Sequence, residues 1–109
     1  MDKQTLIDKL AALPGLIEDA ENEVIRAVDL LQGQKDRLTE AQDRLLILGT
    51  IDGKNQETRN AQLRAQTTAE QFTVRKAENE LSVARAHLNR LTNELAVCRA
   101  IAGMLKGVE

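Results

Sequence analysis

The sequence predicts an all-α fold, a long antiparallel two-helix coiled-coil hairpin. Three observations carry this prediction: the composition, two heptad repeats, and a short glycine-containing segment between the repeats. Leu and Ala supply 30 of the 109 residues, and Phe72 is the single aromatic residue. Such a composition is typical of long helices and lacks the β-branched and aromatic residues that strands require.

The first repeat lies between residues 16 and 48, where apolar side chains recur at alternating steps of three and four. Its members are Ile17, Ala20, Val24, Ala27, Leu31, Gln34, Leu38, Ala41, Leu45 and Leu48. A pattern sustained over nearly five heptads predicts that one face of this helix packs in a coiled coil. Gly49 follows and is expected to end the helix, because glycine adopts the left-handed conformation at a helix C-terminus.

The second repeat lies between residues 56 and 106. Its strong part comprises Val74, Ala77, Leu81, Ala84, Leu88, Leu91, Leu95, Cys98, Ala102 and Leu105. A weaker extension passes upstream through Leu63, Thr67 and Glu70. These positions predict a second long helix with its own coiled-coil face.

The N-terminal residues predict a short helix that is broken or kinked at Pro14-Gly15. Proline lacks a backbone N–H and disfavours the helical conformation of the residue before it. We therefore expect helices over 3–13, 15–49 and 56–106 and a turn over 50–55. These elements form one domain, residues 1–109.

A turn centred near Asp52 folds the second helix back on the first. Facing residues then have numbers that sum to about 105, as a short helix–turn–helix connection requires. This register aligns Leu31 with Val74, Leu10 with Leu95, Leu6 with Cys98, and the polar residues Gln34 and Glu70. It also places Glu21 beside Arg85, where they are expected to form a surface ion pair.

Apolar residues outside the two repeats predict a homodimer that forms a four-helix bundle, since two helices alone bury little surface. The interface candidates are Ile25, Val28, Phe72, Val83, Val97, Ile101 and Met104. The alternative is that these are scattered exposed apolar residues, which are common on protein surfaces.

The sequence predicts no catalytic residue, metal site or cofactor, and hence no enzyme. His87 has Val83 and Leu91 at the helical spacing where a second metal ligand would be needed. Cys98 occupies a core position of the second repeat and is interpreted as a small apolar residue. A hydrolase that uses Asp52 or His87 is a minor alternative, because nothing assembles a nucleophile, a base and a pocket.

Charge and cysteine content point to a cytoplasmic protein without a membrane segment. The formal net charge is −2, which argues against nucleic-acid binding through bulk charge alone. Residues 1–49 hold 10 acids and 6 bases, and residues 50–109 hold 7 acids and 9 bases. A single cysteine fits a reducing compartment, and we expect neither a signal peptide nor a membrane span, since the sequence contains no run of about 20 apolar residues.

The segment from Ile51 to Leu63, IDGKNQETRNAQL, followed by a long heptad helix, carries a resemblance. It resembles small helical-hairpin proteins of tailed bacteriophages and prophages, often encoded near recombination and replication genes. The resemblance implies a phage or prophage origin and carries over no catalytic residue. The candidate interaction loop comprises Asp52, Gly53, Lys54, Asn55, Arg59 and Gln62.

Two functions follow as hypotheses. The first is a non-enzymatic scaffold that binds an unknown protein partner through this loop and the outer helix faces. The second is a DNA-binding accessory factor of a phage recombination or replication module. In the second, Lys54, Arg59 and the N-terminus of the following helix attract a DNA phosphate.

Overall fold

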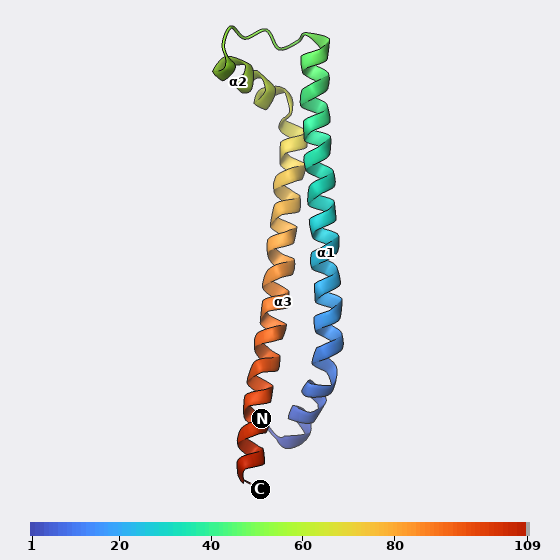
Figure 1. Cartoon of the computed structure of the whole chain (residues 1–109), viewed down its shortest axis with the longest axis vertical. Helices are drawn as coiled ribbons and strands as arrows, with labels where there is room; N and C mark the ends of the chain where they lie inside the picture. Colours follow the sequence, from blue (N-terminus) through green and yellow to red (C-terminus); the bar gives the residue numbers. More distant parts are fainter. Residues whose placement is uncertain (109) are drawn as a thin grey trace. The chain divides into compact units, whose positions relative to one another are not determined.

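The computed structural model describes residues 1–108 and, within them, contains three helices and no strand (Figure 1). Helix α1 spans Lys3–Leu48, α2 spans Gln56–Gln66, and α3 spans Thr68–Val108. The predicted all-α class is confirmed. None of the helices in this part of the chain is both long and apolar enough to span a bilayer.

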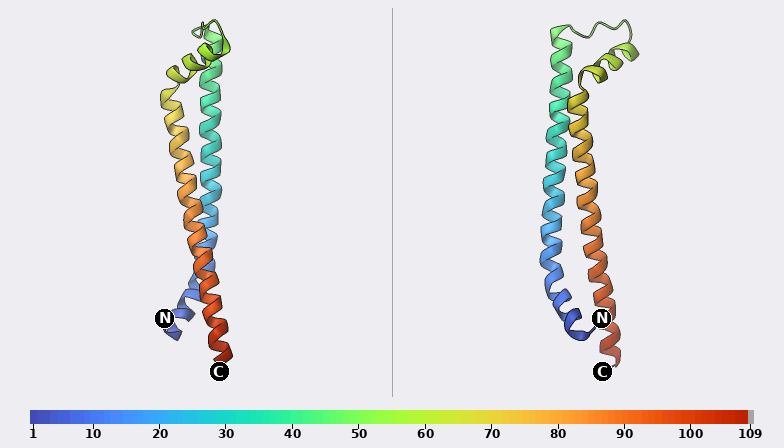
Figure 2. Two further views of the ribbon diagram at one scale, coloured as in Figure 1. Left: turned by 90° about the vertical axis from the view of Figure 1, so that its left-hand side faces the viewer. Right: turned by 180° about the vertical axis from the view of Figure 1, so that it is seen from behind.

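The contacts divide the chain into two compact units. Unit 1 comprises Met1–Arg26 and Ser82–Glu109, and unit 2 comprises Ala27–Leu81. Each unit contains one stretch of α1 that runs antiparallel to one stretch of α3, and α2 belongs to unit 2 (Figures 1 and 2). The antiparallel pairing expected from the two repeats is therefore confirmed within each unit.

Both ends of α1 are capped by local hydrogen bonds. Asp2 precedes the helix, and its Oδ1 accepts a 2.7 Å bond from the Thr5 backbone N–H, which lowers the pKa of the Asp2 carboxyl. At the other end Gly49 has a φ of +73°. Its N–H donates to the Leu46 carbonyl over 3.2 Å, and the Thr50 N–H donates to the Leu45 carbonyl over 3.3 Å. This pair of bonds is the Schellman motif, so the predicted role of Gly49 is confirmed.

The two separate helices predicted over 3–13 and 15–49 are wrong, because α1 continues through Pro14, and of the break and the kink expected there the structure has the kink (Figure 2). Figure 2 shows instead that the first, dark-blue part of α1 bends. A proline inside a helix removes one hydrogen bond and clashes with the carbonyl four residues earlier, which kinks the helix at a cost of about 3 kcal/mol. Leu6 and Leu13 offset this cost, since both are buried against α3.

The core of unit 1 is apolar and follows the predicted register. Leu6, Leu13 and Cys98 form its buried cluster, with exposed fractions of 4%, 2% and 0%. The half-buried residues Leu10, Leu91, Leu95, Ile101 and Ala102 pack around it. At its edge the Lys9 Nζ lies 2.8 Å from Glu94 Oε1, whereas Glu21 and Arg85 form no ion pair within the described residues. The interhelical ion pair is thus one that the sequence analysis did not anticipate.

The seam of unit 2 also uses the predicted heptad positions. Val74, Ala77 and Leu81 of α3 are buried. On α1, the members of the first repeat from Ala27 to Leu45 are half-buried. The last member, Leu48, is 66% exposed. The coiled-coil face of α1 therefore ends one heptad position before the helix does.

The single helix predicted over 56–106 is wrong, because it is interrupted at Thr67. This residue has φ −121° and ψ 31° and separates α2 from α3. In Figure 1, α2 leaves the line of the first, yellow turns of α3. The weak repeat upstream of Val74 contained polar residues, and such a face gains too little from burial to hold a continuous helix against α1.

Candidate functional site: the loop between α1 and α2

The Gln62 side chain ties the loop to α2. Its Nε2 donates to Asp52 Oδ1 over 2.6 Å, and its Oε1 accepts a 2.9 Å bond from the Gly53 backbone N–H. One amide group therefore holds two consecutive loop residues against the helix that follows them. A side-chain amide has donors and an acceptor on adjacent atoms, so a single residue type satisfies both partners.

Gly53 is required in this loop because α2 lies very close to it. A Cβ at this position would lie 2.8 Å from the Arg59 backbone nitrogen and 2.9 Å from Thr58 Cγ2. These distances are shorter than a side-chain carbon tolerates, so glycine is needed for space and not for an unusual φ. The Arg59 side chain also contacts Gly53, since its Nη1 lies 3.5 Å from the Gly53 carbonyl oxygen.

Asn55 caps the N-terminus of α2. It has an extended backbone (φ −137°, ψ 170°), and its side-chain oxygen accepts a 2.8 Å bond from the Thr58 N–H. Its backbone carbonyl accepts the first helical bond, from the Arg59 N–H, over 3.0 Å. Asp52, the other acceptor in this loop, is bonded to Gln62 instead, so Asn55 serves as the cap.

Lys54 is the residue of the loop that faces outward. Its side chain is exposed and, within residues 1–108, forms no hydrogen bond or ion pair. The five other predicted loop residues are engaged with one another or with the first turn of α2. The structure thus brings together all six predicted residues, five of them hydrogen-bonded within the loop or to the first turns of α2 and one, Lys54, an exposed cation without such a bond.

Two polar residues, Thr67 and Gln71, hold the opposite end of α2 by hydrogen bonds that the heptad pattern did not predict. The buried Thr67 Oγ1 donates to the Leu63 carbonyl over 2.6 Å and accepts a 2.9 Å bond from Gln71 Nε2. Gln71 Nε2 also donates to the Arg64 carbonyl over 3.0 Å. The Thr67 N–H donates to the Arg64 carbonyl over 3.4 Å and not to the Leu63 carbonyl, so the Thr67 hydroxyl supplies the donor that the Leu63 carbonyl would otherwise lack. The sequence signal was present, since Thr67-Thr68-Ala69-Glu70 has the spacing of a helix-capping box.

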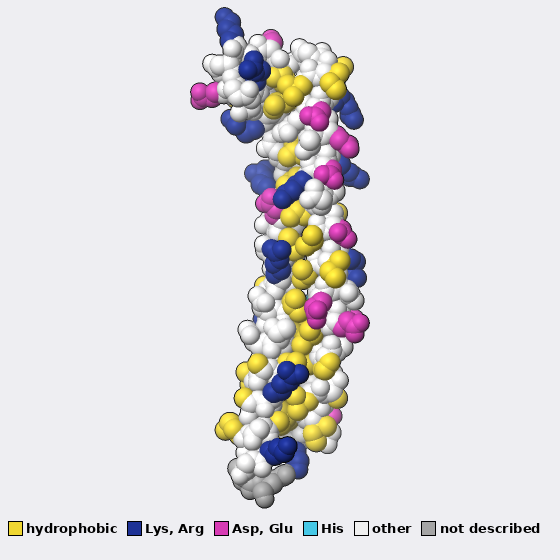
Figure 3. Space-filling model, viewed as in Figure 1, with side chains coloured by type: hydrophobic (Ala, Val, Ile, Leu, Met, Phe, Trp, Pro, Cys, Tyr) yellow, Lys and Arg dark blue, Asp and Glu magenta, His cyan; other side chains and the backbone are white. Residues whose placement is uncertain are grey.

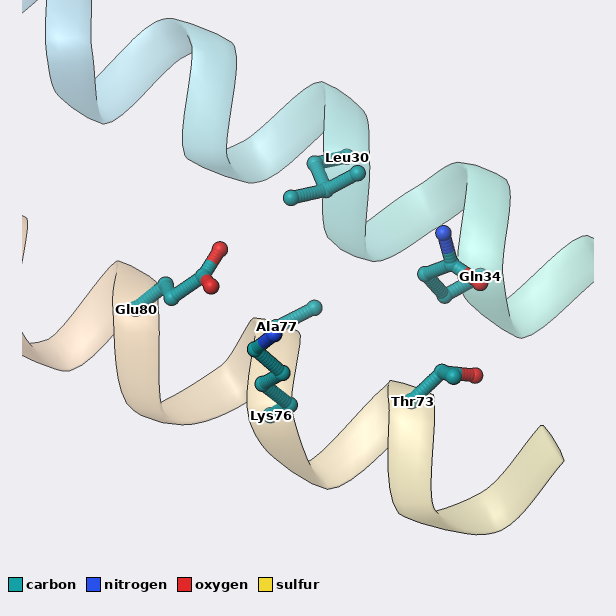
Figure 4. Close-up of a pocket in the computed structure, with 6 residues that line it drawn as sticks. All are labelled: Leu30, Gln34, Thr73, Lys76, Ala77 and Glu80. Carbon is teal, nitrogen blue, oxygen red and sulfur yellow. The ribbon is translucent and has the colours of Figure 1, made fainter. Parts of the chain in front are cut away.

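A shallow hollow of about 210 Å³ lies in the seam of unit 2 (Figure 4). Figure 4 shows Leu30 and Gln34 from α1 pointing toward Thr73 and Ala77 from α3. A neighbouring hollow of about 180 Å³ is lined by both Gln34 and Glu70. The predicted coincidence of these two polar residues is therefore confirmed, and small or polar side chains leave the seam incompletely filled there.

His87 and Cys98 occupy the surroundings expected of structural residues. His87 is exposed on α3. Cys98 is fully buried among leucines and has no free access to solvent. Within residues 1–108, no group of three or more His, Cys, Asp or Glu side chains is arranged to hold a metal ion.

Six of the seven predicted interface residues are exposed, and Figure 3 shows hydrophobic side chains on the solvent surface of both helices. The exposed fractions are 59% for Ile25, 42% for Val28, 61% for Phe72, 66% for Val83, 55% for Val97 and 72% for Met104. Ile101 differs, because it is half-buried against the Leu6–Leu13–Cys98 cluster. It belongs in part to the core of unit 1.

Comparison of the chain with protein-family models, with curated proteins and with solved structures finds no match.

Proposed function

We propose that the chain is a non-enzymatic coiled-coil interaction protein that binds a protein partner through the loop between α1 and α2. The observation that supports this most is the loop itself. Asp52, Gly53 and Gln62 form an internal network that leaves Lys54 exposed. A loop held in one conformation loses little entropy on binding, so it presents its charge to a partner at low cost.

We further propose that the chain acts as a homodimer and forms a four-helix bundle. The exposed side chains of Ile25, Val28, Phe72, Val83 and Val97 support this, together with Met104. From the resemblance of the 51–63 segment we add a phage or prophage origin and action in the host cytoplasm.

The second candidate is a DNA-binding accessory factor. The exposed, unpaired Lys54 next to the N-terminus of α2 favours it, because the helix N-terminus and a cation together attract phosphate. Arg59, the other predicted phosphate ligand, is directed at the Gly53 carbonyl within the loop. This leaves one exposed cation in the loop, which is weaker support than a continuous basic surface.

Affinity purification from the native host tests the first candidate. We expect a partner recovered with the unmodified chain to fall at least tenfold with Lys54→Glu. It should be retained with Lys35→Glu, which makes the same charge change on the exposed surface of α1. Circular dichroism checks that both variants keep their helix content. Equal recovery of every bound protein by the two variants would overturn the assignment of the loop.

A gel-shift titration with single- and double-stranded DNA tests the second candidate. Binding that weakens steeply with salt, and that Lys54→Glu reduces more than Lys35→Glu, would favour the DNA-binding function. Absence of a shift at tens of micromolar protein in low salt would remove it.

A further inference from the structure

We propose that two copies of the chain pair antiparallel through the outer stripe of α3 in unit 1. The stripe consists of Val83, Ala86, Arg90, Asn93, Val97 and Ala100. This inference rests on the proposed homodimer and is independent of the loop at residues 51–62. It names the surface, the orientation and the register of the dimer.

The six residues share one exposed face of α3. They recur at alternating steps of three and four, as the core positions Ala84, Leu88, Leu91, Leu95 and Cys98 do on another face of the same helix. All six are exposed, with Val83 at 66% and Val97 at 55%. This stretch of α3 therefore has two heptad faces, of which α1 covers one.

The order of apolar and polar residues along the stripe is the same in both chain directions. An apolar pair, Val83 and Ala86, is followed by the polar pair Arg90 and Asn93 and then by the apolar pair Val97 and Ala100. A surface with this symmetry is complementary to a reversed copy of itself. A two-fold dimer needs such self-complementarity, because the same patch serves both subunits. This identifies a second copy of the chain as the occupant.

In the antiparallel register that aligns the stripes of the two copies, apolar residues face apolar residues and polar residues face polar residues. Val83 then faces Ala100 of the second copy, and Ala86 faces Val97 of the second copy. The layers extend over 17 helical steps, or about 26 Å at 1.5 Å per residue. Alanine opposite valine in each apolar layer allows the two helices to approach closely.

The charges separate this arrangement from a parallel one. In a parallel dimer Arg90 would face Arg90 of the second copy, and like charges at facing positions repel. In the antiparallel dimer Arg90 faces Asn93 of the second copy, and the asparagine oxygen accepts a hydrogen bond from the guanidinium. The polar pair at the centre therefore selects the orientation, as isolated polar residues do in coiled coils.

Disulfide cross-linking of full-length chains tests the register. Cysteines are introduced singly as Val83→Cys and Ala100→Cys on a Cys98→Ala background, which removes the buried native thiol. We expect a mixture of the two variants to form a disulfide-linked heterodimer at least tenfold more abundant than either homodimer. Residues 83 of the two copies would be about 26 Å apart, far beyond the reach of a disulfide.

Other cross-linking patterns would overturn the inference. Homodimers from each variant alone would show a parallel dimer. A heterodimer from Val83→Cys mixed with Ala86→Cys, but not with Ala100→Cys, would show a shifted register.

Sedimentation provides a second test that does not require cysteines. We expect the double substitution Val83→Lys with Val97→Lys to raise the dimer dissociation constant at least a hundredfold. Ile47→Lys, at an exposed α1 position that is not an interface candidate, should leave it unchanged. If Ile25→Lys disrupts the dimer and the double variant does not, the assignment of the outer stripe as the interface is overturned. The homodimer itself would stand. A monomer at micromolar concentration would overturn both, while the proposed role of the loop would remain open to its own test.

Discussion

The core of unit 1 and the loop–α2 segment of unit 2 are stabilised by different kinds of interaction. The unit 1 core is built around Leu6, Leu13 and Cys98, which make non-directional apolar contacts. The loop–α2 segment is held by hydrogen bonds of 2.6–2.9 Å at Gln62 and Thr67 and by the close approach at Gly53. Substitutions that remove side-chain volume should therefore destabilise the unit 1 core most. Substitutions that add a carbon atom or remove a hydroxyl should destabilise the loop–α2 segment most.

The difference also separates stability from function. An apolar core tolerates exchange among residues of similar size, whereas a hydrogen-bonded loop depends on particular donors and acceptors. The residues that hold the loop around Lys54 therefore lie in the region where few substitutions are allowed.

The largest effect is expected from Leu13→Ala in the unit 1 core. Leu13 is 2% exposed, so truncation leaves a cavity and should lower the free energy of unfolding by about 2–5 kcal/mol. Urea denaturation measures it. Leu16→Ala, at a position 48% exposed on the same helix, is the matched control and should change it by less than about 1 kcal/mol. Similar losses for both variants would contradict the described core.

The second largest effect is expected from Gly53→Ala. The added Cβ would meet the Arg59 nitrogen at 2.8 Å, which forces the loop to shift and should cost about 1–3 kcal/mol. Gly33→Ala provides the control, because nothing lies within 4 Å of its Cβ. An alanine inside α1 should stabilise by about 0.5–1 kcal/mol. Thermal unfolding compares the two, and stabilisation by Gly53→Ala would show that the loop is not held as described.

Thr67→Val tests the interruption between α2 and α3. Valine keeps the branched shape but removes the hydroxyl that bonds the Leu63 carbonyl and Gln71, so the free energy of unfolding should fall by about 1–2 kcal/mol. Thr92→Val removes an exposed hydroxyl from α3 and should change it by less than about 0.5 kcal/mol. Hydrogen exchange at residues 63–71 locates the change. Unaltered protection there would argue against a structural role for the hydroxyl.

The smallest effect is expected from the Lys9–Glu94 ion pair. The hydrogen bond to Glu94, and then the attraction of its charge, raise the pKa of Lys9 above its ordinary value. A group with a raised folded-state pKa stabilises fully below its unfolded-state pKa, and the contribution disappears as the pH rises through the folded-state pKa. The free energy of unfolding of the unmodified chain should therefore exceed that of Lys9→Met at neutral pH. This difference should vanish in strong alkali. Lys35→Met, at an exposed position, should show no such pH dependence.

The heptad seams were predictable from the sequence because burial follows the repeat residue by residue. Ala20, Val74, Ala77, Leu81 and Cys98 are all buried and all belong to the two predicted series. The loop candidates were also found in advance, since glycine and asparagine mark a turn and a helix cap by their backbone chemistry. Their roles were not, because the bond between Asp52 and Gln62 joins residues ten positions apart.

The two helix boundaries that were predicted wrongly have a common cause. At Pro14 the local preference for a break is overridden by burial of Leu13 before it and of Ala20 after it. At Thr67 the local preference for a continuous helix is overridden by side-chain bonds to the Leu63 and Arg64 carbonyls. In both places the decisive contacts come from outside the local heptad pattern, which that pattern cannot report.

The sequence by itself determined the helical class, the antiparallel pairing and the positions that form the seams. These depend on the period of the apolar residues, which is a property of the chain alone. Only the tertiary structure decided that α1 runs through Pro14, that α2 separates from α3 at Thr67, and that Lys54 faces outward. The physical reason is that these outcomes depend on side-chain contacts that the apolar period does not encode, whether to α3, as for Leu13, or within a few residues, as for Thr67.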